Sequence, residues 1–230
     1  MRTRLGTRRH RAAMSRGISL AIIGCDGSGK SAVVDVLADR LADRFPSIEV
    51  HHLRPHFISM RKRSPNAGPV TNPHGNPPYG STLSIIKAVY LFADYTLGHR
   101  AVITPQLALG SLVIWDRYAY DLAIDPRRLR YGGPIRLAQW LALHVPQPDL
   151  VVVLDAPVDT LLARKQEVSE SELCRQRNAY LRLAHSLTHA RVVANDVDVE
   201  AAALAVERHV IAFLQTQDRA VRRRHGVPAQ

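Results

Sequence analysis

The strongest constraint on this chain is a glycine-rich motif near its N-terminus. Residues 24–31 read Gly-Cys-Asp-Gly-Ser-Gly-Lys-Ser and match the pattern G-x-x-x-x-G-K-[ST] in full. The short apolar run Ile18–Ile23 precedes the motif, and an apolar repeat typical of an amphipathic helix covers residues 31–45. Strand, glycine turn and helix in this order predict a phosphate-binding loop, because glycines let successive backbone amides converge on phosphate oxygens.

The motif also assigns roles to its polar residues. We expect Lys30 to reach the β and γ phosphates of a nucleotide, and Ser31 to offer its hydroxyl to Mg²⁺. The positive end of the following helix strengthens the same anion site. The predicted nucleotide-binding residues are Gly24, Cys25, Asp26, Gly27, Ser28, Gly29, Lys30, Ser31 and Ala32.

Short apolar runs alternate with amphipathic stretches along the rest of the chain. Strands are predicted at residues 18–23, 48–53, 112–115, 150–154 and 191–194. Helices are predicted at residues 31–45, 82–99, 135–144, 158–167, 170–187 and 200–214. This alternation predicts an α/β fold, a three-layer α/β/α sandwich with a parallel sheet of the P-loop nucleotide kinase type.

The net charge of +11 is concentrated at the two ends of the chain. Residues 1–16 hold six arginines and residues 219–230 hold four, with no acidic residue in either stretch. We therefore expect a disordered basic extension over 1–16, a kinase domain over 17–217 and a basic tail over 218–230. Non-specific contact of these ends with anionic polymers or membranes is the alternative, but a groove specific for nucleic acid is not expected.

Two segments inside the predicted domain stand out by composition. Residues 54–80 contain six prolines and three glycines, which predicts a long irregular loop. Residues 164–177, called the lid segment below, mix arginines and lysine with glutamates. Kinases use mobile cations to screen charge during phosphoryl transfer, so Arg164 is our first choice for a catalytic cation. A solvated pair of charged helices is the alternative.

Several functional classes are excluded or disfavoured. The chain has no run of about eighteen apolar residues, so no membrane-spanning helix is expected. Its two cysteines cannot build a disulfide framework or a four-ligand zinc site, and a cytoplasmic location is expected. No N-K-x-D motif of a GTPase occurs, and a mechanical ATPase needs a longer chain. A small kinase that uses ATP and Mg²⁺ is the economical interpretation.

A second site element is the sequence Asp116-Arg117, which ends the apolar run 112–115. A carboxylate at the tip of a buried parallel strand faces the ligand crevice. Asp116 is expected to hold Mg²⁺ together with Ser31 or to accept the acceptor's proton, while Arg117 grips an acceptor phosphate. The alternative is that Asp116 only caps the strand. The predicted catalytic residues are Lys30, Asp116, Arg117 and Arg164.

These residues resemble the thymidylate kinase family of P-loop nucleotide kinases. Residues 24–31 contain the family's D-G-S-G-K pattern, residues 91–94 (Leu-Phe-Ala-Asp) resemble its L-F-A-A-D segment, and residues 116–118 match its D-R-Y motif. Residues 148–164 resemble the strand and helix that lead into its lid. The resemblance implies ATP, Mg²⁺, phosphoryl transfer to a nucleoside monophosphate, and pairing of two copies. It also implies that Asp26 helps to arrange Mg²⁺ or the acceptor phosphate, and that Asp94, Arg117 and Tyr118 lie at the acceptor.

The acceptor half departs from the family pattern. Tyr95 stands where the family has an arginine, and residues 119–134 lack its Y-Q-G stretch. Arg127 and Arg128 in this stretch are predicted to bind a second anionic group, with an exposed basic loop as the alternative. This stretch resembles that of divergent thymidylate-kinase-like proteins encoded among bacterial surface-polysaccharide genes, and the resemblance implies a sugar or another small metabolite as an alternative acceptor. A nucleotide-binding regulator without transfer activity is the third hypothesis.

The histidines His51, His52 and His56 cluster near the end of the second predicted strand. We expect them to form part of an ordinary pocket rim, with a metal site as the alternative.

Overall fold

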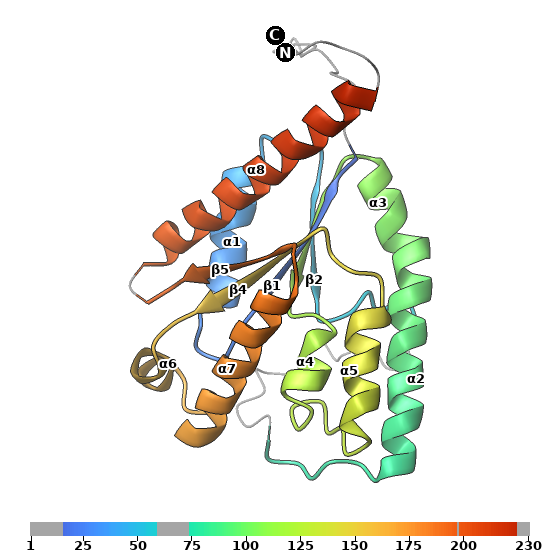
Figure 1. Cartoon of the computed structure of the whole chain (residues 1–230), viewed down its shortest axis with the longest axis vertical. Helices are drawn as coiled ribbons and strands as arrows, with labels where there is room; N and C mark the ends of the chain where they lie inside the picture. Colours follow the sequence, from blue (N-terminus) through green and yellow to red (C-terminus); the bar gives the residue numbers. More distant parts are fainter. Residues whose placement is uncertain (1–15, 59–73, 197, 225–230) are drawn as a thin grey trace, which may run out of the picture.

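The computed structural model describes residues 16–58, 74–196 and 198–224 of the chain. Its centre is a sheet of five parallel strands in the order β2-β3-β1-β4-β5 (Figure 1). The strands are β1 (Ile18–Ile23), β2 (Ile48–His52), β3 (Leu112–Asp116), β4 (Leu150–Asp155) and β5 (Ala190–Ala194). The predicted parallel sheet is confirmed. Because β3 and β4 flank β1, the crevice at the carboxyl ends of these three strands is the place where this fold class binds ligands.

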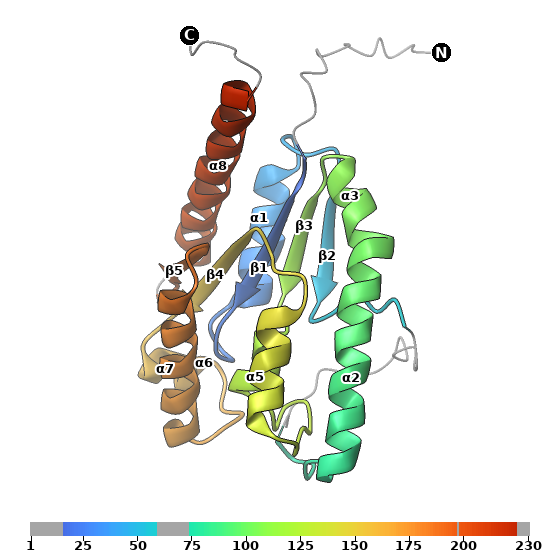
Figure 2. The same cartoon turned by 45° about the vertical axis from the view of Figure 1, so that its right-hand side comes forward.

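Helices cover both faces of the sheet and complete the predicted three-layer sandwich. The helices are α1 (Lys30–Leu41), α2 (Ser81–Gly98), α3 (Thr104–Ala108), α4 (Tyr120–Ile124), α5 (Ile135–His144), α6 (Val158–Arg164), α7 (Glu170–Ser186) and α8 (Val199–Arg224). The helices α1 and α8 pack together on one face, and α2, α5 and α7 lie on the other (Figure 2).

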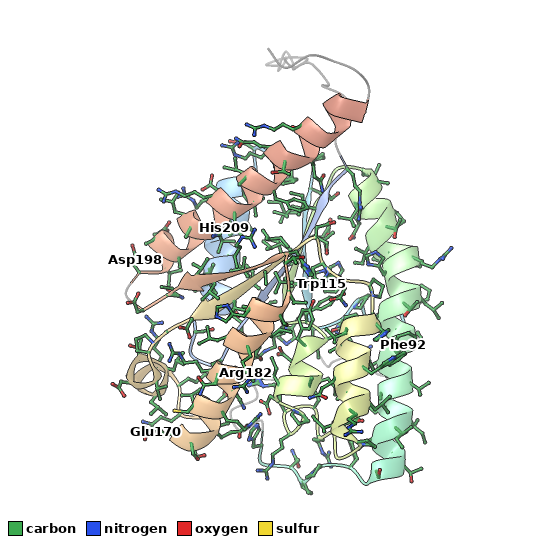
Figure 3. All side chains as sticks on the ribbon, viewed as in Figure 1. Phe92, Trp115, Glu170, Arg182, Asp198 and His209 are labelled. Carbon is green, nitrogen blue, oxygen red and sulfur yellow. The ribbon has the colours of Figure 1, made fainter. Side chains whose placement is uncertain are left out.

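The alternation of side chains along β1 explains how one strand serves both cores. Ile18, Leu20 and Ile22 are fully buried against α1 and α8. Ala21 and Ile23 point to the opposite face and join the core beneath α2, α5 and α7. Trp115 of β3 lies in that second core, in the interior of the molecule (Figure 3). A strand buried on both faces needs the continuous apolar run that the sequence contains.

Several helices differ from the sequence prediction. The helix α1 ends at Leu41 instead of residue 45, and α6 ends at Arg164 instead of residue 167. The helical run that starts with α2 does not stop at residue 99, because a π-helical turn, His99–Ile103, leads it into α3. Pro105 then falls in the first turn of α3, where its missing N–H costs no hydrogen bond. The short helix α4 was not predicted, and α8 continues to Arg224 instead of ending near residue 214, so it extends into the predicted basic tail.

Some predictions fall on residues that the structure does not describe. These are most of the basic extension, residues 59–73 of the irregular loop, and the last six residues of the basic tail. The described ends of the irregular loop, 54–58 and 74–80, contain no helix or strand, as predicted. Within the described ranges, none of the helices combines the length and the hydropathy needed to cross a membrane.

Leu20 tests the assignment of β1 as the central buried strand. Leu20→Ala removes a fully buried side chain from the core between the sheet, α1 and α8, and should lower the free energy of unfolding by about 3 kcal/mol. Val50→Ala on β2 is the matched control, since 51% of Val50 is exposed, and should cost less than about 0.5 kcal/mol. Urea denaturation measures both, and equal losses would contradict the assignment.

Candidate functional site

The glycine-rich motif forms a tight loop between β1 and α1. Gly24 and Gly29 adopt φ angles of 145° and 79°, which side-chain-bearing residues rarely adopt. A Cβ atom on Gly24 would lie 2.4 Å from the carbonyl oxygen of Leu154, and one on Gly29 would lie 2.4 Å from Asn195 Nδ2. These positions therefore require glycine. The amides of the first turn of α1 have no intrahelical carbonyl partner, so this end of the helix is suited to an anion.

Lys30 lies inside the loop and not in solvent. Its ammonium donates hydrogen bonds to the carbonyl oxygens of Gly24, at 2.9 Å, and Cys25, at 2.7 Å. Burial and the nearby positive charge of Arg117 lower the pKa of Lys30 to about 8, although neighbouring carboxylates oppose the shift. Burial also raises the pKa of the Cys25 thiol to about 12, so this cysteine is an unreactive packing residue.

The sheet register brings Asp116 to the loop. Asp116 pairs with Ile22 of β1 on one side and with His52 of β2 on the other. Ser31 Oγ donates a hydrogen bond of 3.0 Å to Asp116 Oδ2, and His52 Nδ1 lies 3.4 Å from the same oxygen. Burial alone would raise the pKa of Asp116, but the contact with His52 and the charge of Lys30 hold it below its usual value. The carboxylate is therefore ionised beside the Ser31 hydroxyl.

The oxygens at Asp116 suit a magnesium ion. Asp116 Oδ1 is buried and has no hydrogen-bond partner among the described residues. A hard cation prefers such carboxylate and hydroxyl oxygens, and Mg²⁺ needs only one or two protein ligands because water and phosphate oxygens supply the rest. No group of three or more His, Cys, Asp or Glu side chains in the described ranges forms a metal site by itself. The pocket-rim prediction for the three clustered histidines holds for His52 alone, because His51 packs against Trp115 and His56 contacts the carbonyl oxygen of His52.

A buried ion-pair network extends from the loop to α4 and α7. Arg117 donates hydrogen bonds to Asp26 of the loop and, at 2.8 Å, to Asp121 Oδ2 of α4. Tyr180 of α7 donates to the other oxygen of Asp121, at 3.0 Å. Burial opposes ionisation of Asp26, yet Arg117, Lys30 and Arg128 hold its pKa far below the usual range. The backbone of Arg117 adopts a φ of 75°, and its amide donates to the carbonyl oxygen of Ile22. Contacts therefore hold both the backbone and the guanidinium of this residue in place.

The lid segment places two cations, Arg164 and Lys165, at the cavity and holds two arginines away from it. Arg164 donates to the carbonyl oxygens of Asn195, at 2.7 Å, and Asp196, at 2.8 Å. Asn195 in turn donates from Nδ2 to the carbonyl oxygen of Ser28, at 2.7 Å, so this residue joins Arg164 to the loop. The other two arginines pair with carboxylates: Arg175 with Glu172 and Arg177 with Asp155.

These elements enclose a cavity of about 540 Å³. The lining residues are Asp26, Gly27, Gly29, Lys30, Ser31, Ala32, His52, Asp116, Arg117, Arg128, Arg164 and Lys165. All four predicted catalytic residues and both predicted magnesium ligands are among them. Five cationic side chains against two carboxylates make the cavity suitable for a polyanion.

Three predicted acceptor residues do not line this cavity. Asp94 is fully buried, where it accepts hydrogen bonds from Arg54 Nη1, at 2.7 Å, and from the amide of Ile58, at 2.6 Å. Tyr118 packs edge-on against Tyr95 and Trp115, and its hydroxyl donates to the carbonyl of Pro146. Arg127 is exposed and faces a separate groove between α5 and α7. In this structure Asp94 fixes the start of the 54–80 loop, and Tyr118 belongs to the core.

Three residues that do not line the cavity, and for which we predicted no role, hold its residues in place. Asp121 positions Arg117, Asn195 positions the loop, and Glu167 contacts Arg128. Asn195 follows a predicted strand directly, as Asp116 does, and this position is the only signal in the sequence that could have found it.

Comparisons with known proteins agree with this geometry. No protein-family model matches the chain. The chain is 30% identical over 157 residues to a thymidylate kinase from Chlamydia felis, a match that covers 64% of this chain and 70% of the relative. It is 29% identical over 191 residues to a probable thymidylate kinase from Pyrococcus horikoshii, which covers 77% and 88% of the two chains. A crystal structure of thymidylate kinase from Ehrlichia chaffeensis has the same fold, with a TM-score of 0.56, 17% identity, and coverage of 85% of this chain and 99% of that one. On the strength of the first match, the chain belongs to the thymidylate kinase family, as a divergent member.

Proposed function

We propose that this protein transfers the γ-phosphoryl group of Mg·ATP to a nucleoside monophosphate, with thymidylate as the first candidate, and that it acts in the cytoplasm. The observation that carries the proposal is the cavity at the carboxyl ends of β1 and β3, where Lys30, the Ser31–Asp116 pair and Arg117 meet. The names of the relatives support the choice of thymidylate.

The loop side of the cavity supports the binding of ATP. The backbone of residues 24–31 and the first turn of α1 would hold the phosphates, and the Lys30 ammonium would exchange its two carbonyl partners for phosphate oxygens. Ser31 and Asp116 would hold Mg²⁺, which supplies charge neutralisation at the phosphates when bound. Arg164 reaches the cavity from the lid segment and would add positive charge where the phosphoryl group leaves.

The acceptor side depends on Arg117. Its guanidinium has a fixed orientation because Asp26 and Asp121 bind it from two sides. A planar guanidinium can bind two oxygens of a phosphate at once, so Arg117 would orient an acceptor phosphate towards the loop. Phosphoryl transfer needs positioning and charge stabilisation more than covalent chemistry, and these residues supply both.

A panel of acceptors tests this function. With Mg·ATP, we expect acceptor-dependent ADP release with dTMP. Release with sugars but with no nucleotide, or tight ATP binding without release, would contradict the proposal and favour a metabolite kinase or a regulator.

Lys30→Ala should lower kcat by about 100-fold to 1,000-fold, because it removes a cation from the transferring phosphates. Arg208→Ala removes an exposed cation of α8 and is the matched control.

The pKa of Lys30 predicts a pH dependence of ATP binding. In the free protein this pKa is about 8, and bound phosphates raise it, so binding takes up a proton above pH 8. The affinity for Mg·ATP should therefore be constant between pH 6.8 and 7.5 and then fall by up to about tenfold per pH unit above pH 8. Calorimetric titration measures it. In Lys30→Met the affinity should be weak and independent of pH, and a slope retained in this variant would refute the assignment.

We also propose that two copies pair through α2. Leu83, Ile86, Val89 and Leu97 form an apolar stripe along this helix, and 48–63% of each side chain is exposed. A second copy that presents its own α2 would cover both stripes in one symmetric contact. Phe92 of α2 packs on Trp140 of α5, with ring centroids 5.4 Å apart, so α5 supports the helix that carries the stripe.

Sedimentation velocity tests the pairing. We expect the protein to sediment as a dimer and Val89→Asp to sediment as a monomer, since a carboxylate at the centre of the stripe would lose its hydration in the contact. Val192→Asp is the control, because Val192 is also exposed but lies on β5 at the far edge of the sheet. A monomeric wild-type protein would refute the pairing.

A further inference from the structure

Arg128 connects three segments that are far apart in the sequence. It lies in the turn after α4, and one of its terminal nitrogens, Nη2, donates to Asp26 Oδ2 in the phosphate-binding loop. The same nitrogen donates to Glu167 Oε2 in the lid segment, at 2.9 Å. Its backbone amide donates to Asp125 Oδ1, at 3.2 Å, which fixes the turn itself. We call Asp26, Arg128 and Glu167 the clasp.

The clasp is well shielded from water. The side chains of Asp26, Arg128 and Glu167 are exposed by 10%, 18% and 4%, respectively. Two carboxylates brought together at this depth repel each other unless a cation lies between them. Arg128 supplies that cation, and charge-assisted hydrogen bonds of this kind are stronger than neutral ones. Arg128 therefore holds Glu167 of the lid segment against Asp26 of the loop, beside the separate link that Arg164 makes to the loop through Asn195.

The clasp also determines where the cations of the lid segment lie. Lys165 Nζ lies 2.6 Å from Glu167 Oε1, so the carboxylate that Arg128 holds also holds Lys165. Arg164 and Lys165 both line the cavity, and they precede Glu167 by three and two residues. Because Glu167 is held against the loop, the short stretch of backbone that follows Arg164 and Lys165 is held there as well.

We propose that Arg128 is a positioning residue, which ties the lid segment to the phosphate-binding loop through Glu167 and Asp26. This role differs from the direct binding of a second anionic group that the sequence predicts for Arg128. The effect of Arg128 on the rate of the reaction rests on the proposed kinase function, whereas the contact between loop and lid segment does not.

Hydrogen exchange of the full chain without nucleotide tests the contact. In Arg128→Gln, the hydrogen-bonded backbone amides on either side of Glu167, those of Lys165 and Leu173, should exchange about tenfold faster than in the wild type, because the segment loses its attachment. Glu167→Gln should have a similar effect, and the double variant should exchange no faster than either single variant, since both changes break one contact. Glu170→Gln, an exposed neighbour, is the control and should leave the exchange unchanged.

Unchanged exchange in Arg128→Gln, or additive effects in the double variant, would overturn the proposal. Thermal unfolding of each variant shows whether faster exchange is local. If the amides of β1 and β4 exchange faster to the same extent as those of Lys165 and Leu173, the effect is global loss of stability and the clasp is refuted.

Steady-state kinetics separates positioning from binding of the acceptor. If Arg128 positions the lid segment, Arg128→Gln should lower kcat about tenfold and change the acceptor KM by less than about twofold. A raised acceptor KM with an unchanged kcat would show that Arg128 binds the acceptor, and would overturn the positioning role. A wild-type protein with no kinase activity would refute the proposed function alone, because the exchange experiment still decides whether the clasp exists.

Discussion

The rest of this site depends on how positive charge is held at one edge of the sheet. A phosphate site needs cations, yet buried cations repel each other and lose hydration. Here each one has a defined partner. Lys30 is held by loop carbonyls, Arg117 by Asp26 and Asp121, and Arg164 by carbonyls after β5. This pairing gives each cation a polar partner within the protein, which offsets part of the repulsion between the cations.

Asp26 is the centre of this arrangement. It belongs to the phosphate-binding loop, but its carboxylate contacts Arg117 on the acceptor side and Arg128 in the clasp. One carboxylate thus links the part of the site that would hold the donor with the parts that would hold the acceptor and close the lid segment. The low pKa of Asp26 follows from the same contacts, so the link remains ionised across the physiological range. Asp26 occupies a position that the general pattern G-x-x-x-x-G-K-[ST] leaves open, and here it links the loop to Arg117 and Arg128.

The acceptor side shows where prediction from sequence stops. The D-R-Y and L-F-A-D matches identify the correct strand and helix, but the structure places Tyr118 in an aromatic cluster and Asp94 on Arg54. Tyr95, at the position where the family has an arginine, donates to the carbonyl of Leu53 and packs against Tyr118. A motif reports which residue types follow one another, whereas the direction of each side chain depends on the neighbours that folding supplies.

Local sequence patterns were enough to predict the parallel α/β sandwich, the phosphate-binding loop and five residues that line its cavity, which are Lys30, Ser31, Asp116, Arg117 and Arg164. Apolar runs, glycine spacing and the residues that directly follow strands can each be recognised within a few positions of the chain. Other contacts became visible only in the folded molecule: His52 lies beside Asp116, Asn195 supports the loop, and Arg128 joins Asp26 to Glu167. These contacts join segments 39 to 167 residues apart, and their existence depends on strand order and register, which local patterns do not encode.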